Sequence, residues 1–152
     1  MRFLCSLQFW QMYRYWPNFI NPSSFFEKMW HRMLHDRDPK LTLICDKLLV
    51  RDYVAGKVGV EYLVPLLWSG NNPYEIPFDK LPLKFVIKTN HGCGYNIIVG
   101  HKSLIDQIKV KVQLKKWLGE NYCQEEFLGI EWGYKNIKPA IIIESFIEDK
   151  GK

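Results

Sequence analysis

The sequence predicts an α+β fold, in which N-terminal helices are followed by a small antiparallel sheet that one long helix covers. Three observations favour this fold. A helix-start signal near Ser24 precedes apolar residues at helical spacing. Two short strand-like segments flank a glycine-containing loop at residues 91–95, as they would in a hairpin. An apolar run at residues 140–147 is typical of a buried strand.

The N-terminal part is predicted to be helical. Ser24 is suited to cap a helix, and Glu27 is placed to return a hydrogen bond to the cap. This helix should end near His35, because an Asp-Arg-Asp-Pro sequence follows it. A second helix is expected from about Asp46 to Lys57.

The sheet is predicted from four strand-like segments, which cover residues 61–67, 84–88, 96–99 and 140–147. Residues 69–73 are rich in loop-forming side chains. A helix from Ser103 to about Leu118 should cover the sheet, and its inward side chains are expected to be Ile105, Ile108, Val112 and Leu118.

Composition indicates a folded, aromatic-rich protein of 152 residues with a net charge of +5. Such a charge fits either an ordinary solvated surface or affinity for polyanions such as nucleotide phosphates or acidic glycans. We expect no nucleic-acid partner. No segment is long and apolar enough to span a membrane, and no signal peptide is evident. The scattered cysteines suggest free thiols and a cytoplasmic location; they are Cys5, Cys45, Cys93 and Cys123.

The strongest chemical signal is Lys88, which ends a predicted strand directly before the glycine loop. A strand fixes the direction of the ammonium group, and the glycines let backbone N–H groups approach an anion. A surface lysine beside an ordinary turn remains the alternative. The loop matches neither GxxxxGK[ST] nor GxGxxG.

Two further charged residues have open interpretations. Lys47 follows Asp46 at a predicted helix start, where both could simply be solvated. Glu144 lies within the apolar strand, so it should either face solvent or bind something.

Two histidine patterns are weaker. His91 and Cys93 could form a nucleophilic pair, but no orienting carboxylate is evident. His31 and His35 have metal-ligand spacing without the Glu of an HExxH motif, so no metal ligand is predicted.

An ordered set of segments resembles the TupA-like ATP-grasp proteins, a family of bacterial surface-polysaccharide (teichuronopeptide) biosynthesis. The similarity covers about residues 20–149. The segments that carry it are 21–28, 45–47, 51–54, 59–67, 84–99, 132–139 and 144–149.

This resemblance implies a site for ATP. Lys47 and Lys88 correspond to the two lysines that hold the phosphates, and residues 91–95 to the loop over them. The strand at 140–147 becomes the hinge, whose backbone around Glu144 receives adenine, while Glu148 or Asp149 reaches the ribose. The implied nucleotide-binding residues are Lys47, Lys88, His91, Gly92, Cys93, Gly94, Glu144, Ser145, Ile147 and Glu148.

The resemblance also implies a function and its limits. It points to ATP and magnesium as cofactors of a ligase that activates a carboxylate, with an acidic sugar or polymer precursor as a possible substrate. Residues 1–45 would form a helical segment, and 46–152 part of an ATP-grasp domain. Family magnesium ligands follow the hinge, so we expect the C-terminal lobe to be missing here, and a partner chain could supply it.

Several questions stay open at this stage. The catalytic residues are unknown, and so is whether the chain alone is an enzyme. A glycosyltransferase of polysaccharide biosynthesis and a non-catalytic remnant are the alternatives. If the apolar hinge strand has one face open towards a missing lobe, the chain should self-associate.

Overall fold

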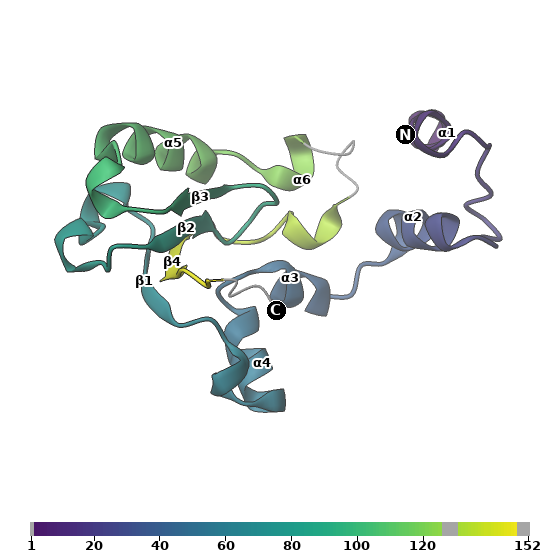
Figure 1. The fold of residues 1–152 in the computed structure, drawn as a ribbon. Helices are drawn as coiled ribbons and strands as arrows, with labels where there is room; N and C mark the ends of the chain where they lie inside the picture. Colours follow the sequence, from purple (N-terminus) through teal and green to yellow (C-terminus); the bar gives the residue numbers. More distant parts are fainter. Residues whose placement is uncertain (1, 126–130, 149–152) are drawn as a thin grey trace.

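The computed structural model describes residues 2–125 and 131–148 and confirms an α+β fold (Figure 1). The helices are α1 (Arg2–Tyr13), α2 (Phe25–His35), α3 (Lys40–Cys45), α4 (Val50–Val58), α5 (Gln107–Gly119) and α6 (Tyr122–Glu125). The strands are β1 (Leu66–Gly70), β2 (Phe85–Thr89), β3 (Asn96–Val99) and β4 (Ile141–Ser145).

The four strands form one antiparallel sheet in the order β1-β4-β2-β3. The predicted hairpin is confirmed, since β2 pairs with β3 across the glycine loop, with Lys88 opposite Asn96. Strand β4 pairs with β2 on one side and with β1 on the other, so it is an inner strand.

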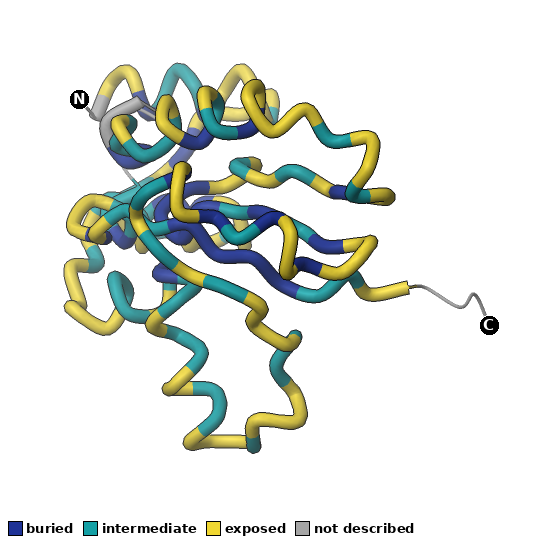
Figure 2. Tube along the Cα trace, turned by 90° about the vertical axis from the view of Figure 1, so that its left-hand side faces the viewer, coloured by how far each residue is buried: buried dark blue, intermediate teal, exposed yellow. Residues whose placement is uncertain are grey.

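The two faces of the sheet differ in what they pack against. Phe85 and Ile87 of β2 and Ile141 and Ile143 of β4 are fully buried in the main core, together with Leu114 of α5. Figure 1 shows α5 along this side of the sheet, and the buried residues coloured in Figure 2 include those of the two inner strands, β2 and β4. Because side chains alternate along a strand, Lys88 and Glu144 point to the opposite face.

Helices α1 and α2 form a separate small cluster, in which Cys5, Phe9 and Trp30 are buried. The predicted cap of α2 is confirmed: the Ser24 hydroxyl accepts from the Glu27 N–H, and the Glu27 carboxylate accepts from the Ser24 N–H. Hydrogen bonds from Ser24, Asn18 and Ser23 lower the pKa of Glu27 to about 2.

The strand predicted at residues 61–67 is wrong in position. Residues Val60–Tyr62 form a 3-10 turn, and β1 spans Leu66–Gly70. Two residues of the predicted loop at 69–73 therefore lie in the sheet, where Ser69 pairs with Ile142. Pairing with β4 decides the strand's position, and local composition does not contain that information.

Two helix predictions are also corrected. The helix expected from Asp46 begins at Val50, after a turn, and α3 was not foreseen. The helix expected from Ser103 begins at Gln107, where the Asp106 side chain caps it.

The inward face of α5 matches the predicted one only in part: Leu118 packs against the core as expected, and so does Ile105 just before the helix, but Ile108 and Val112 do not. Val110 and Leu114 are buried, whereas Ile108 is 76% and Val112 61% exposed. The two sets are offset by two residues, about 200° around a helix, so they lie on opposite faces. The buried set carries Trp117 on the same side, which adds a large aromatic contact to the core.

The expectation that one apolar face of the hinge strand is open is wrong. All residues from Ile141 to Glu144 are buried, including Ile142 on the side opposite α5. Two neighbouring strands and the segment between α3 and β1 cover them. The case for self-association through this strand therefore fails. Across the two described ranges, no helix combines the length and apolar character of a membrane span.

Candidate functional site

A pocket of about 290 Å³ lies on the face of the sheet opposite α5. Its charged lining residues are Lys47, Arg51, Lys88 and Glu144, and the other walls are largely apolar. Three cations against one carboxylate give this pocket a net positive charge, which suits an anionic ligand.

Glu144 is held between two cations. Its Oε2 lies 2.6 Å from Lys88 Nζ, and its Oε1 lies 2.7 Å from Arg51 Nη1. Arg51 Nη2 also donates to the backbone oxygen of Val64 at 2.6 Å. The Glu144 side chain is only 9% exposed. The carboxylate therefore binds Arg51 and Lys88, and the arginine is itself fixed by a backbone carbonyl.

The sheet register explains how Lys88 reaches Glu144. Val86 is directly opposite Glu144, and Lys88 is opposite Ile142, so the two charged residues are diagonal neighbours on adjacent strands. Diagonal neighbours lie within reach of long side chains. Lys88 keeps a third of its side-chain surface exposed, so its ammonium group remains accessible from the pocket.

Lys47 approaches the same pocket from the turn between α3 and α4. Its ammonium group donates to the backbone oxygen of Gly92 and lies 5.7 Å from the ring centroid of Tyr134. Burial lowers the pKa of Lys47; Cys93 acts in the opposite direction, and the charge of Lys88 lowers the pKa further. Lys47 thus connects the pocket to the glycine loop.

Asn90 follows β2 and joins it to the turn before α4 and to the segment before β4. Its side-chain Nδ2 donates to Asp46 Oδ1 and to the Lys138 backbone oxygen, both at 3.0 Å. Its Oδ1 accepts from the Ala140 N–H at 2.7 Å, and its backbone oxygen accepts from the Lys47 N–H at 3.2 Å. Asp46 in turn caps the following turn by accepting from the Leu48 N–H at 2.8 Å. This network fixes Lys47 relative to β2 and β4.

The glycine loop has an anchored half and an exposed half. His91 and Gly92 are buried, and His91 Nε2 lies 2.9 Å from the Trp117 backbone oxygen on α5. Cys93 and Gly94 are exposed, and Gly94 has a φ of 77°, which glycine adopts without strain. No hydrogen bond joins His91 and Cys93 in the described structure, so their nucleophilic pairing gains no support.

The remaining predicted residues lie at the end of β4. The Ser145 N–H donates to the Pro65 backbone oxygen at 3.0 Å, and Ile147 is 68% exposed. Glu148 pairs with Lys84 at 2.5 Å on the surface. These three do not line the pocket, and Asp149 lies outside the described residues.

The structure therefore gathers Lys47, Lys88 and Glu144 into one pocket. Sequence reasoning missed the roles of Arg51 and Asn90. Arg51 stands four residues after Lys47, a spacing that could have suggested a second cation on the same side. Nothing in the sequence around Asn90 distinguishes it from a turn residue.

The histidine pair of α2 is engaged with the backbone. His31 Nδ1 lies 2.7 Å from the Phe19 oxygen, and His35 Nδ1 lies 2.9 Å from the His31 oxygen. Within residues 2–125 and 131–148, no group of three His, Cys, Asp or Glu side chains could hold a metal ion.

Comparison with known proteins gave one match. A protein-family model described as TupA-like ATPgrasp matches residues 27–152. No curated protein and no solved structure matches the chain. The family match includes every residue that lines the charged pocket and leaves residues 1–26 outside.

Proposed function

The chain belongs to the TupA-like ATP-grasp family, and from this premise we propose that its charged pocket binds the phosphates of ATP. The protein would act as the ATP-binding part of a carboxylate–amine ligase of bacterial surface-polysaccharide biosynthesis. Its acceptor would be an acidic sugar or polymer precursor. Because it would use ATP, we also propose that it works in the cytoplasm.

The observation that carries the proposal is the meeting of Lys47 and Lys88 in one pocket with a net positive charge. The two lysines come from separate elements, a turn and a strand. Lysine offers three donors, so Lys88 can keep its bond to Glu144 and still contact a phosphate oxygen. Gly94 belongs to the loop whose Gly92 oxygen accepts from Lys47, and no atom lies within 4 Å of the place of a Cβ there, so a phosphate can approach its backbone closely.

Arg51 and Glu144 would position Lys88 for this task. A buried carboxylate flanked by two cations holds both in a fixed geometry. With the ammonium direction set before binding, less ordering is needed when phosphate arrives. The adenine would extend along the backbone at the end of β4, near Ser145 and Ile147.

Magnesium does not fit the residues around this pocket. Both oxygens of Glu144 are engaged by cations, and the described residues contain no cluster of three potential ligands. We propose that residues 46–152 form the nucleotide-binding part of an ATP-grasp domain, and that the magnesium ligands lie outside the described residues or on a partner chain.

The test is binding of a fluorescent ATP analogue to the purified chain and to two matched lysine variants. Lys88→Met removes one charge-assisted contact and should weaken binding by at least about tenfold. Lys84→Met is the control, since Lys84 lies four residues earlier, just before β2 begins, and pairs with Glu148 at the surface. It should change affinity less than about twofold.

Two results would count against the proposal. One is the absence of binding by a chain that circular dichroism shows to be folded. The other is equal affinity for the native chain and Lys88→Met. Competition by a nucleotide sugar but not by ATP would favour the glycosyltransferase alternative.

A further inference from the structure

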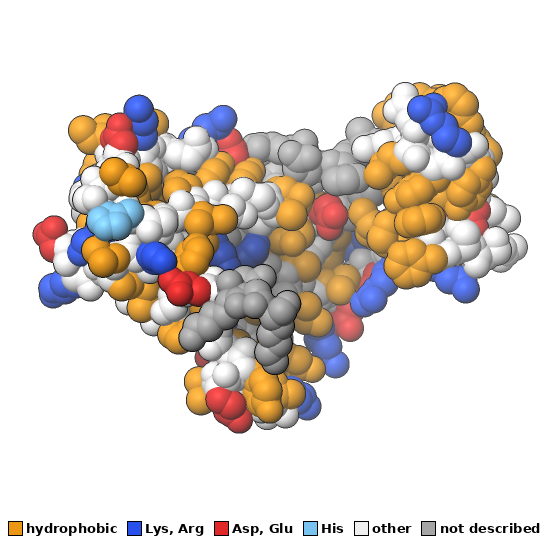
Figure 3. Space-filling view, in the orientation of Figure 1, with side chains coloured by type: hydrophobic (Ala, Val, Ile, Leu, Met, Phe, Trp, Pro, Cys, Tyr) orange, Lys and Arg blue, Asp and Glu red, His pale blue; other side chains and the backbone are white. Residues whose placement is uncertain are grey.

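The N-terminal helices carry many exposed apolar side chains. We define the N-terminal apolar surface by those that are at least 37% exposed: Phe3, Leu4, Trp10, Met12, Tyr15, Trp16, Ile20, Phe25, Phe26 and Met29. Figure 3 shows hydrophobic side chains gathered over α1 and α2 on this part of the molecule. Single exposed apolar residues need no explanation, but a contiguous group marks an interaction site.

Ring contacts show that several of these side chains are neighbours. The ring centroids of Phe3 and Trp16 are 6.3 Å apart, and those of Phe25 and Phe26 are 5.6 Å apart. Phe26 also stacks on Tyr13 of α1 at 4.2 Å. The surface therefore continues from α1 to α2.

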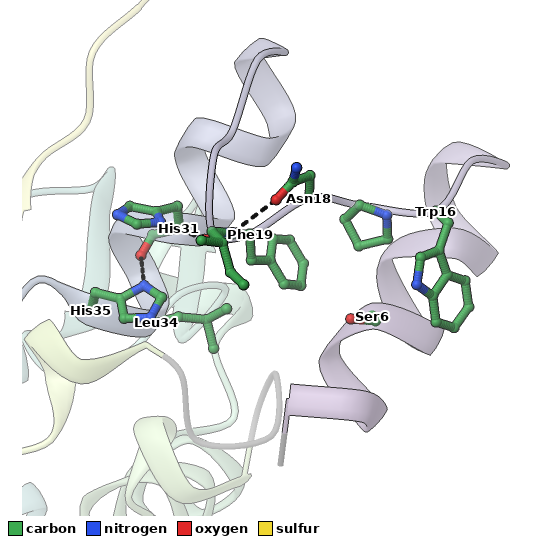
Figure 4. A pocket seen from close by; sticks show the side chains of 9 residues that line it. Ser6, Trp16, Asn18, Phe19, His31, Leu34 and His35 are labelled. Carbon is green, nitrogen blue, oxygen red and sulfur yellow. Dashed lines mark hydrogen bonds between the residues drawn. The ribbon is translucent and has the colours of Figure 1, made fainter.

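A cavity of about 760 Å³ opens between α1, the connecting segment and α2 (Figure 4). Trp16 and Ile20 belong both to its lining and to the N-terminal apolar surface. Phe19 and Leu34 add further apolar wall, while His31 and His35 stand at the α2 side. Its volume is in the range of small-molecule sites, about 300–1,000 Å³.

Charge limits the kind of partner. The sole acidic residue in positions 1–35 is Glu27, which is 4% exposed and accepts hydrogen bonds from three backbone N–H groups and the Ser23 hydroxyl. Arg14 and Lys28 are exposed and have no acidic partner among the described residues. Arg14 lies over the Trp10 ring, 5.9 Å from its centroid. The exposed charge beside the apolar surface is therefore basic.

This combination favours an anionic partner over a second copy of the chain. Two copies meeting through this face would bring like charges together. Exposed tryptophans and other aromatics flanked by basic side chains are typical of segments that lie in the membrane interface, where anionic headgroups attract the charges.

We propose that the N-terminal apolar surface docks onto the surface of an anionic lipid bilayer. Phe25, Ile20 and Trp16 enter the boundary between headgroups and acyl chains, while Arg14 and Lys28 contact lipid phosphates. The cavity beside Trp16 gives acyl methylenes an apolar space. Docking of this kind requires no membrane-spanning helix and is independent of nucleotide binding.

The test is co-sedimentation of the intact chain with vesicles of phosphatidylglycerol and, separately, of phosphatidylcholine. We expect binding to phosphatidylglycerol that weakens as salt rises to about 0.15 M. The double variant Ile20→Ser/Phe25→Ser should lose at least about tenfold in partitioning, because it removes two side chains that are 76% and 74% exposed. Ile108→Ser is the matched control, since Ile108 on α5 is also 76% exposed, and it should bind like the native chain.

A second variant pair tests the charges. Arg14→Gln/Lys28→Gln should reduce binding to phosphatidylglycerol by about fivefold per charge and leave binding to phosphatidylcholine unchanged. Circular dichroism confirms that each variant is folded.

Three results would overturn the proposal. The folded native chain could fail to bind phosphatidylglycerol at low salt, or the Ile20→Ser/Phe25→Ser and Ile108→Ser variants could bind equally. The third result is a lipid-free dimer that Ile20→Ser/Phe25→Ser dissociates, which would assign the surface to a second copy of the chain.

Discussion

Replacing Asn90 with alanine should destabilise the protein more than any ordinary loop substitution. The Asn90 side chain is 1% exposed and makes three hydrogen bonds, to Asp46, Lys138 and Ala140. Truncation leaves the Lys138 carbonyl and the Ala140 N–H without this partner, and it removes one donor from the Asp46 carboxylate, which keeps the Leu48 and Leu49 N–H groups. Each loss costs about 1 kcal/mol for the neutral groups and about 1.5–3 kcal/mol for the charged one.

The expected loss in the free energy of unfolding is therefore about 3–5 kcal/mol. The lower end is the better expectation, because Asn90 also borders a cavity of about 390 Å³ from which water can reach the vacated space. This loss can be measured by urea unfolding, monitored by circular dichroism. If the free energy of unfolding falls by about 2 kcal/mol for each molar of urea, the unfolding midpoint of the variant should be lower by about 1.5 M or more.

Asn96→Ala is the matched control, since Asn96 is exposed on β3 and should change stability by less than about 0.5 kcal/mol. A loss below about 1 kcal/mol for Asn90→Ala would refute the reasoning, because it would mean that the three partners are satisfied without it.

Three further predictions concern pH and packing. The pKa of Glu27 is about 2 in the folded chain against an ordinary 4.5, so its contribution to stability is complete above pH 4.5 and is lost as pH falls towards 2. Across this pH range the melting temperature of Glu27→Gln should fall less than that of the native chain, and parallel curves for the two proteins would contradict this. Burial lowers the pKa of Lys47, so ATP-analogue affinity should decline with rising pH below 10.5, whereas Lys47→Arg should flatten the profile because arginine keeps its charge; identical profiles would contradict it. A Cβ on Gly133 would lie 2.6 Å from Cys45 Sγ, so Gly133→Ala should lower the free energy of unfolding by about 1–3 kcal/mol. Gly100→Ala is the control and should have a smaller effect, because a Cβ on Gly100 would have no atom within 4 Å. Urea unfolding midpoints measure both variants, and equal midpoints would be inconsistent with the close contact.

Features that depend on neighbouring residues were predictable from the sequence. The Ser24–Glu27 cap, the strands on either side of the glycine loop and the position of β4 all arise from residues close together in the chain. Their signals are local spacing, turn chemistry and an apolar run, which the sequence contains in full.

Features that depend on distant pairing were not predictable. The position of β1 is set by its register with β4, and the inward face of α5 by contact of Leu114 with the sheet. In the candidate site, Lys88 was singled out by its place before the glycine loop, and the family resemblance paired it with Lys47. Arg51 was missed because its partner, Glu144, lies 93 positions away and only the folded sheet brings them together.

The inner position of β4 has a consequence for the order of folding. Strands β2 and β3 are joined by a short loop and can pair as soon as both are synthesised, whereas β1 waits for a partner that begins at Ile141. Until that segment arrives, β1 and the hairpin each present an unpaired edge, the kind of edge that recruits other chains. We therefore expect docking of the last strand to limit the folding rate, because it closes the longest loops in the sheet. The interval before it docks is when nascent or refolding chains are most exposed to aggregation.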